Sequence, residues 1–252
     1  MTYPQPGFVN GKGYFHFFTK YTGIRELYFE YSGNGWQWTE DKKLAGIREP
    51  GDELGGHYQV SNQYDGKLAT FFNRHPNGNV DKRTDLYYIQ TTDFGKTWTT
   101  VDQRKLAIPL SEADNPARII DYQSQGKNVY LKDINFDKKG DPVCLYVISD
   151  GHEPGPENGP REWCITYWTG MNWKTKIICV SDHNYDMGSL FIRGNRWQLV
   201  APVIEGPQKW GTGGEIAFYK SRNCGKTWDM TEQVTSDSRY NHSYMRRPVD
   251  AR

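Results

Sequence analysis

The sequence has no long apolar run, no excess charge of one sign and no closely spaced cysteine pair. No stretch approaches the ~18 apolar residues of a membrane-spanning helix. Lysine and arginine total 31 against 30 acidic residues, so no field of one sign draws the chain to nucleic acid or membrane. The cysteines form no CxxC pair, which argues against a zinc knuckle. We therefore expect no nucleic-acid or membrane partner, and a monomer.

A signal peptide is also missing, because the opening MTYPQPGFVN has neither its charged nor its apolar region. We still expect a secreted or periplasmic protein whose signal is not part of this chain. No cofactor is expected, although a structural calcium or zinc ion stays open. Cys144 and Cys164 lie in neighbouring predicted strands, so a disulfide between them is an alternative to buried free thiols.

What the sequence does have is aromatic residues, at 15%, together with 26 glycines and 13 prolines in 252 residues. This composition is typical of many short strands joined by tight turns. Apolar residues spaced for a helix are nearly absent, whereas RELYFEYS places Leu27, Phe29 and Tyr31 on one face of a strand. The sequence therefore predicts an all-β fold.

Four similar blocks of four predicted strands end at tryptophans that stand 60, 75 and 55 residues apart. Four-stranded units of this length are the blades of a β-propeller. We predict one domain over residues 1–252, made of four to five blades. The ring either closes within this chain or is part of a larger one, and Met1 directly before a first-strand motif favours the larger ring. The blades are predicted at roughly 1–50, 51–112, 113–181 and 182–236, and 237–252 would form a closing or next-blade strand.

One turn motif repeats between the third and fourth strands. TTDFGKTW, at Thr91–Trp98, combines a glycine that permits positive φ with an aspartate that accepts hydrogen bonds from turn amides. We expect Trp98 to enter the blade interior, which makes the motif architectural. It resembles the Asp-box (BNR) repeat. SRNCGKTW has Asn223 in the acid position, and SGNGWQW and WTGMNW are shorter copies.

Ionisable and aromatic residues gather on the predicted first strands, which line the channel of a propeller where ligands bind. Arg74 and His75 end a second strand, and Tyr146 and Arg161 frame a long loop of the kind that often serves function. That loop could equally be a solvated insertion, and isolated histidines such as His16 and His152 are read as structural. The first-strand candidates are His57, Tyr58, Lys132, His183, Tyr185, Asp186, His242, Tyr244, Arg246 and Arg247.

This inventory favours histidine, tyrosine and arginine over the paired carboxyl groups that most glycosidases use. β-Elimination of a uronate needs a base for the C5 proton, a cation for the carboxylate and an acid for the leaving oxygen. Histidine or tyrosine can supply the base and the acid, and arginine can hold the carboxylate.

Several segments, among them GGHYQVS, HPNGNVDKRTDLYY, EPGPENGPREW and SDHNYDMGSL, together resemble the BNR-repeat family of bacterial carbohydrate-active proteins. That family is similar to β-propeller polysaccharide lyases, including ulvan and rhamnose–glucuronate lyases. The resemblance implies a polysaccharide lyase acting on an acidic polysaccharide or oligosaccharide. It implies that His57 or His75 is base or carboxylate partner, Tyr146 acid or base, and Arg161 the neutralising cation. The substrate-binding residues would be Tyr58, Arg74, Lys132, His183, Tyr185, His242, Tyr244 and Arg246.

Two other functions stay open at the sequence level. Asp-box propellers include sialidases, and Arg25, Arg48, Arg161 and Arg246 could be considered for their arginine triad, although REP at 48–50 is a poor match to the usual first-blade motif. A non-catalytic glycan-binding propeller would instead stack exposed aromatics such as Tyr185 and Trp210 on sugar rings.

Overall fold

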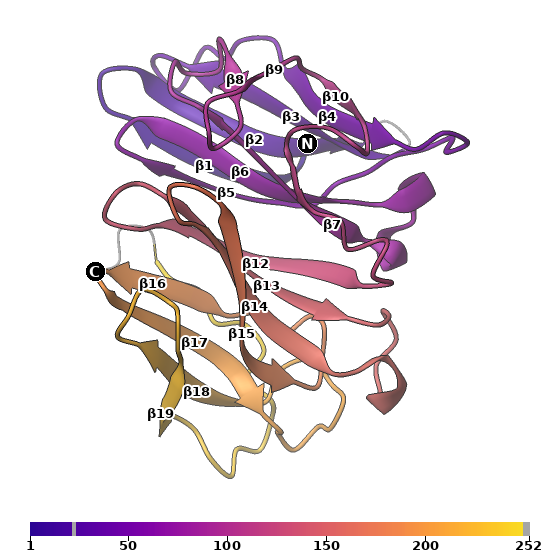
Figure 1. The fold of residues 1–252 in the computed structure, drawn as a ribbon, viewed down its shortest axis with the longest axis vertical. Coiled ribbons are helices and arrows are strands. Elements are labelled where there is room, and N and C mark those ends of the chain that lie inside the picture. Colours follow the sequence, from indigo (N-terminus) through magenta and orange to yellow (C-terminus); the bar gives the residue numbers. More distant parts are fainter. Residues whose placement is uncertain (22–23, 249–252) are drawn as a thin grey trace. The chain divides into compact units, whose positions relative to one another are not determined.

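A computed structural model describes residues 1–21 and 24–248, and strands make up most of its regular structure. The chain divides into two compact units, Met1–Gln125 and Gly126–Arg252 (Figure 1). Each unit contains two sheets, in which consecutive strands pair antiparallel. The only regular helices in the described ranges are single 3-10 turns, and none of them could cross a membrane.

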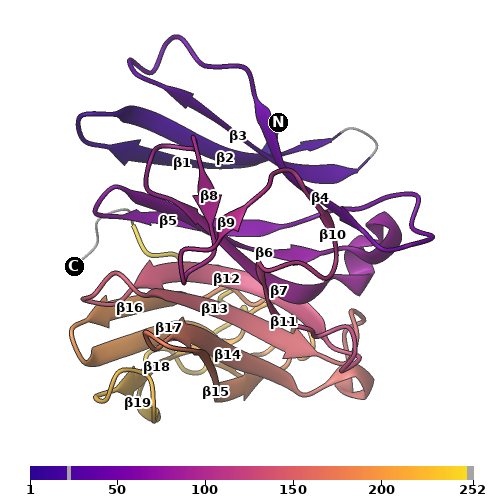
Figure 2. The ribbon, with the colours of Figure 1, turned by 45° about the horizontal axis from the view of Figure 1, so that its top comes forward.

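The first unit contains a sheet of order β1-β2-β3-β4-β10 and a sheet of order β5-β6-β7-β8-β9 (Figure 1), with β11 added beside β7 (Figure 2). Strand β10 runs parallel to β4, whereas β11 is antiparallel to β7. The elements are β1 (Thr2–Val9), β2 (Gly13–Tyr21), β3 (Arg25–Ser32), β4 (Lys42–Arg48), β5 (Gln59–Tyr64), β6 (Lys67–Arg74), η1 (Pro76–Gly78), η2 (Val80–Lys82), β7 (Thr84–Thr91), β8 (Trp98–Thr99), β9 (Lys105–Leu106), β10 (Leu110–Glu112) and β11 (Arg118–Ile120).

The second unit contains two four-stranded sheets, β12-β13-β14-β15 and β16-β17-β18-β19, each with its strands in chain order (Figure 2). Strands β12 and β16 lie against each other. The elements are β12 (Asn128–Phe136), β13 (Pro142–Ser149), η3 (Pro156–Asn158), β14 (Arg161–Trp168), β15 (Trp173–Ser181), β16 (Ser189–Arg193), β17 (Arg196–Ile204), β18 (Glu215–Ser221) and β19 (Asp229–Gln233).

The all-β fold with four-stranded antiparallel units is confirmed. The short strands β10 and β11 were not predicted from the sequence. Strand β10 lies in the predicted second blade but pairs with β4 of the first sheet, and β11 lies in the predicted third blade but pairs with β7. In its described part, residues 237–248, the predicted closing strand makes only isolated bridges: His242 pairs with Gly214, and Tyr244 pairs with Met187. Residues 249–252 of that predicted strand lie outside the described residues.

The core of the first unit forms where the sheets present alternating apolar faces to one another. Leu27 and Phe29 of β3 are fully buried, as the alternation in RELYFEYS predicts. Trp98 is 2% exposed, and its ring centroid lies 5.0 Å from that of Phe29 and 5.9 Å from that of Phe17. One tryptophan of the second sheet therefore fills the core against rings of the first.

The turn that delivers Trp98 has the predicted hydrogen bonds. Asp93 Oδ1 accepts from the Thr97 amide at 2.8 Å, and Asp93 Oδ2 accepts from the Thr97 hydroxyl at 2.6 Å. Thr91 Oγ1 accepts from the Gly95 amide at 2.9 Å. Gly95 has φ +85, and a Cβ there would lie 2.9 Å from the Phe29 ring, so glycine is required by both backbone and space.

The other copies repeat this turn with changes that follow from their sequences. Asn223 Oδ1 accepts from the Thr227 amide at 3.0 Å, and its Nδ2 donates to the Thr227 hydroxyl at 2.8 Å, so an amide replaces the carboxylate. The copy at Ser32–Trp38 is one residue shorter than Thr91–Trp98. Its closing Trp38 is 40% exposed, in contrast to the buried Trp98.

The alternative between a disulfide and free thiols is settled. All four cysteines are free, and burial raises the pKa of the Cys144 thiol well above its usual value and that of Cys179 to about 12. The acidic stretch after β12 forms a hairpin turn, in which Asp137 Oδ1 accepts from the amides of Lys139 and Asp141 at 2.8 and 3.0 Å.

Replacing Asp93 with alanine should lower the free energy of unfolding by about 1–3 kcal/mol, since it removes the acceptor for the Thr97 amide and hydroxyl. Asp93→Asn should keep most of the stability, because Asn223 makes the equivalent contacts with Thr227 in the copy at Ser221–Trp228. Urea denaturation of the two variants provides the measurement. Equal losses in both would show that charge, and not hydrogen bonding, holds the turn.

Candidate active site

His75 sits where β6 ends, and its position is fixed through the backbone. Its amide donates to the Gly56 carbonyl at 2.8 Å, and the side chain is 1% exposed. The ring packs closely against Gly56, where a Cβ would lie 3.0 Å from His75 Nδ1. Its Nε2 is buried and makes no hydrogen bond within the described residues. A buried polar atom without a partner costs about 1–3 kcal/mol, which makes it a candidate for function.

Aromatic and cationic side chains surround this imidazole. The Tyr58 ring lies 4.7 Å from the His75 ring, and the Arg83 guanidinium lies 4.8 Å from the Tyr58 centroid. Arg25 lies 5.7 Å from the same centroid, and the exposed Tyr3 packs edge-on against Tyr58 at 5.0 Å. We call these five residues the His75 cluster. It combines an imidazole, two phenols and two guanidinium groups.

Burial and nearby charges keep the His75 imidazole and the Tyr58 phenol uncharged. Burial lowers the pKa of His75 well below its ordinary value, and the nearby His57, Arg83 and Arg25 lower it further. Burial raises the pKa of the Tyr58 phenol to about 12, and its hydrogen bond with Tyr3 adds to the rise. At neutral pH the cluster therefore offers an uncharged imidazole and a protonated phenol beside two permanent cations.

His57 is the most constrained of the predicted catalytic residues. Its Nδ1 donates to the Asn73 carbonyl at 2.8 Å, and its Nε2 accepts from the Ile47 amide at 3.1 Å. These partners fix the tautomer with the proton on Nδ1. Burial lowers its pKa to about 4. The catalytic role of His57 stays a prediction, and the ring would have to release a backbone partner before it could take another proton.

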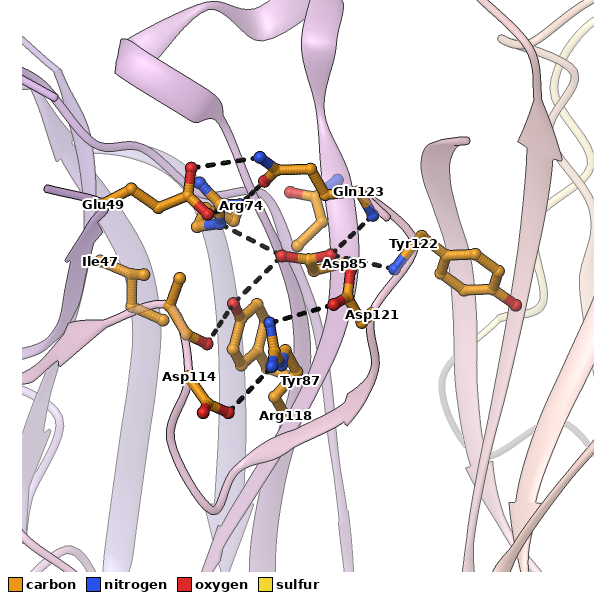
Figure 3. Close-up of polar contacts among 12 residues, drawn as sticks. Ile47, Glu49, Arg74, Asp85, Tyr87, Asp114, Arg118, Asp121, Tyr122 and Gln123 are labelled. Carbon is orange, nitrogen blue, oxygen red and sulfur yellow. Dashed lines mark hydrogen bonds and ion pairs between the residues drawn. The ribbon is translucent and has the colours of Figure 1, made fainter. Parts of the chain in front are cut away.

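Arg74 lies in a polar network shown in Figure 3. Its Nε donates to Asp85 at 3.2 Å, and Nη2 donates to Glu49 at 3.1 Å and to Gln123. Asp85, with φ +59, accepts from the amides of Tyr122 and Gln123 at 3.0 Å. The guanidinium thus joins the end of β6 to the segments after β4 and β11, and substrate binding by Arg74 stays a prediction.

In the second unit, Tyr146 and Arg161 occupy buried positions. Tyr146 lies on β13, is fully buried, and shares a 2.7 Å hydrogen bond with the Thr166 hydroxyl. Arg161 opens β14, and its guanidinium donates to the carbonyls of Gly155 and Glu153. Arg161 therefore holds the long loop between these strands. The acid–base and neutralising roles of the two residues stay predictions.

A second group of predicted residues lies at the amino-terminal end of β16. The His183 and Tyr185 rings are 5.7 Å apart, and Tyr185 is 45% exposed. Lys132 Nζ donates to the Asn184 carbonyl at 2.6 Å. Asp186 Oδ1 accepts from the Gly213 amide at 2.6 Å, and burial raises the pKa of Asp186 to about 6. The Tyr185 phenol is thus exposed to solvent beside the neutral imidazole of His183.

The last predicted residues lie in the segment after β19. His242 Nε2 shares a 3.0 Å hydrogen bond with the Ser238 hydroxyl. The Arg246 guanidinium lies 5.4 Å from the Tyr244 centroid and donates to the Lys132 carbonyl at 2.7 Å. Within its own unit, each of these side chains is exposed or half-buried. Their part in substrate binding stays a prediction.

Of the predicted residues, the first unit brings His75 and Tyr58 together, and the second brings His183 and Tyr185 together. A single cleft containing His57, His75, Tyr146 and Arg161 stays a prediction. Sequence reasoning missed Arg83 and Tyr3, and considered Arg25 only for a sialidase-like triad. The available signal was position: Arg83 lies in the polar loop after His75, and Tyr3 lies in the first predicted strand.

A metal centre has no support in the described ranges 1–21 and 24–248, where no three His, Cys, Asp or Glu side chains are close enough to hold an ion.

Comparison with known protein families adds a decisive observation, because a model described as "BNR repeat-containing family member" matches residues 1–179. The chain belongs to this BNR repeat-containing family. No curated protein matches it.

Among solved structures, this BNR-repeat chain is similar to a polysaccharide lyase of family PL25, an ulvan lyase, with a TM-score of 0.75 and 14% identity. The match covers 92% of this chain and 55% of the lyase, so the chain spans about half the length of that structure. A PL25 ulvan lyase structure bound to -[GlcA(1-4)Rha3S]- gives 0.72, with the same identity and coverage. A protein of unknown function from Dyadobacter fermentans gives 0.57 at 17% identity, covering 92% and 68% of the two chains. These likenesses show the fold.

The buried His57 should make stability depend on pH. The unfolded imidazole takes a proton below about pH 6.5, whereas the folded one resists until about pH 4. The free energy of unfolding should therefore fall by about 3 kcal/mol as pH drops through this range. His57→Asn, which can still donate to the Asn73 carbonyl, should remove this component of the slope in urea titrations at a series of pH values. An unchanged slope would contradict the assignment.

Proposed function

We propose that this protein is a polysaccharide lyase that cleaves a uronic-acid-containing glycan by β-elimination. The observation that carries the proposal is the buried, unpartnered Nε2 of His75 beside the Tyr58 phenol and the guanidinium groups of Arg25 and Arg83. These are the three kinds of group that elimination from a uronate requires, namely base, acid and carboxylate-neutralising cation.

In the proposed reaction, Arg25 and Arg83 hold the uronate carboxylate, which makes negative charge developing at C5 less costly. His75 Nε2 takes the C5 proton in the tautomer with hydrogen on Nδ1. The C5–H electron pair forms the C4=C5 double bond, and the C4–O bond breaks. The Tyr58 hydroxyl gives its proton to the leaving oxygen. No water is consumed, and the new sugar end is an unsaturated uronate.

The pKa directions support this division of roles. An imidazole kept neutral at physiological pH can accept a proton, so the lowered pKa of His75 fits a base. A phenol with a pKa of about 12 stays protonated, so Tyr58 fits an acid better than a base. His57 fits a supporting role, because both of its ring nitrogens already bind the backbone.

The charge of Arg25 also supports the assignment. Arg25 makes no ion pair within 4.0 Å with any carboxylate of the described residues, and it lies near three tyrosine rings. A guanidinium that stacks on aromatic rings keeps its hydrogen-bond donors available for an anion. The similar solved lyase whose structure holds -[GlcA(1-4)Rha3S]- makes a glucuronate the first substrate to try. Because such a polymer is too large to enter a cell, we also propose a secreted or periplasmic location.

The direct test is ultraviolet absorbance of the conjugated product during incubation with ulvan, gum-arabic-type glycans and other uronate polymers. Absorbance should rise with the wild-type protein. His75→Ala should lower the rate by about 10²–10⁴-fold, the range expected for loss of a general base. Tyr58→Phe should lower it while leaving the fold intact. His152→Ala serves as a matched control, because the His152 side chain is 43% exposed and lies outside the cluster.

The outcomes separate the alternatives. Release of free sugar from an aryl sialoside, without the absorbance change, would favour a sialidase-like hydrolase. Binding without any turnover would favour a glycan-binding propeller, a function consistent with the low exposure of His75 and the exposed rings of Tyr3 and Tyr21. Full activity of the folded His75→Ala variant would overturn the role of His75.

A further inference from the structure

A separate hollow lies in the second unit, at the end of the β16–β17 hairpin. It has a volume of about 970 Å³, within the range of ligand pockets. Eleven residues line it, contributed mainly by β16, β17 and the end of β18. Five of the eleven are cationic, and none is acidic. The cationic residues, which we call the basic pocket residues, are Arg193, Arg196, Lys220, Arg222 and Arg247.

This concentration of charge is a local feature, because the whole chain carries a net charge of only +1. Among the residues that the structure describes, the first four make no ion pair within 4.0 Å. Arg247 Nε forms an ion pair with Asp133 Oδ2 at 4.0 Å and makes no hydrogen bond. The other four basic pocket residues therefore keep guanidinium and ammonium donors that no carboxylate of the described residues neutralises.

The strand register adds an independent observation. Arg193 and Arg196 are directly opposite each other where β16 turns into β17. Like charges in opposed cross-strand positions destabilise a hairpin. The neighbouring loop is tied to this end, because Asn195 Nδ2 donates to the Arg222 carbonyl at 3.1 Å. An anion between the two arginines would turn this repulsion into attraction for both.

We propose that the basic pocket binds the carboxylate or sulfate groups of an anionic glycan. Bidentate guanidinium contacts suit both groups. Gln198, Ser221 and Asn135 supply polar groups for sugar hydroxyls, and the half-buried Phe191 supplies an apolar wall. Single-stranded nucleic acid fits less well, because it needs aromatic faces for stacking and the Trp197 ring is only 2% exposed.

Apart from Arg247, the pocket residues are distinct from the predicted site residues of the second unit. His183 and Tyr185 precede the start of β16, whereas Arg193 ends that strand. The pocket would hold a stretch of polymer by its charges without taking part in bond cleavage. The choice of an acidic glycan as the occupant rests on the proposed function. The charge pattern of the pocket is independent of that function.

The test measures affinity by isothermal titration calorimetry of the full chain with a short heparin oligosaccharide. This oligosaccharide carries both carboxylate and sulfate groups. Arg193→Gln/Arg196→Gln should weaken binding about tenfold or more, equivalent to 1.4 kcal/mol, and added salt should weaken binding to the wild type. Lys174→Gln/Lys176→Gln is the matched control. It removes the same charge from exposed positions of β15 outside the pocket and should leave the affinity unchanged.

Two further probes identify the occupant. Inorganic sulfate should bind more weakly than the oligosaccharide, and single-stranded DNA should bind more weakly as well. Equal loss of affinity in both double variants, or tighter binding of either probe, would overturn the proposal. Pocket-dependent oligosaccharide binding without elimination of any uronate polymer would leave the pocket established and the lyase function refuted.

Discussion

The packing of Trp98 against the other sheet is the interaction on which the first unit depends, because a single sheet cannot bury an apolar face without a partner. The indole lies among the rings of Phe29, Phe17 and Phe15, which belong to the other sheet. Its position is set by the preceding turn, in which Asp93 gathers a backbone amide and a hydroxyl. A local hydrogen-bonding motif thus helps to set how the two sheets pack, and the residues of the His75 cluster lie on those sheets or directly beside the ends of their strands.

The fold could be predicted because its signals are local. Alternation in RELYFEYS and the spacing of Thr91, Asp93, Gly95 and Trp98 depend on neighbouring residues, and both appear in the structure as expected. The short strands β10 and β11 could not be predicted in this way. They pair with β4 and β7, which are far away along the chain, and their own few residues carry little pattern.

The candidate site was harder to predict for the same reason. Histidine and tyrosine in GGHYQVS attract notice as residue types, but their sequence does not show that the backbone occupies both nitrogens of His57 and leaves His75 Nε2 without a partner. Arg83 approaches the Tyr58 ring from the loop before β7, and apart from its position in the polar loop after His75 nothing in its local sequence distinguishes it from other arginines. Which side chain is available for chemistry depends on tertiary contacts, and a pattern of residue types does not contain them.

The four free thiols have a consequence for how the molecule tolerates its surroundings. Because no covalent cross-link joins any pair of these cysteines, cohesion of the sheets rests on ring packing, apolar burial, hydrogen bonds and ion pairs. Pairing of the described strands therefore involves no oxidation of these thiols. Three of the thiols are at least partly shielded, while Cys224 is the exposed one, which leaves a single position open to attachment of a spectroscopic label.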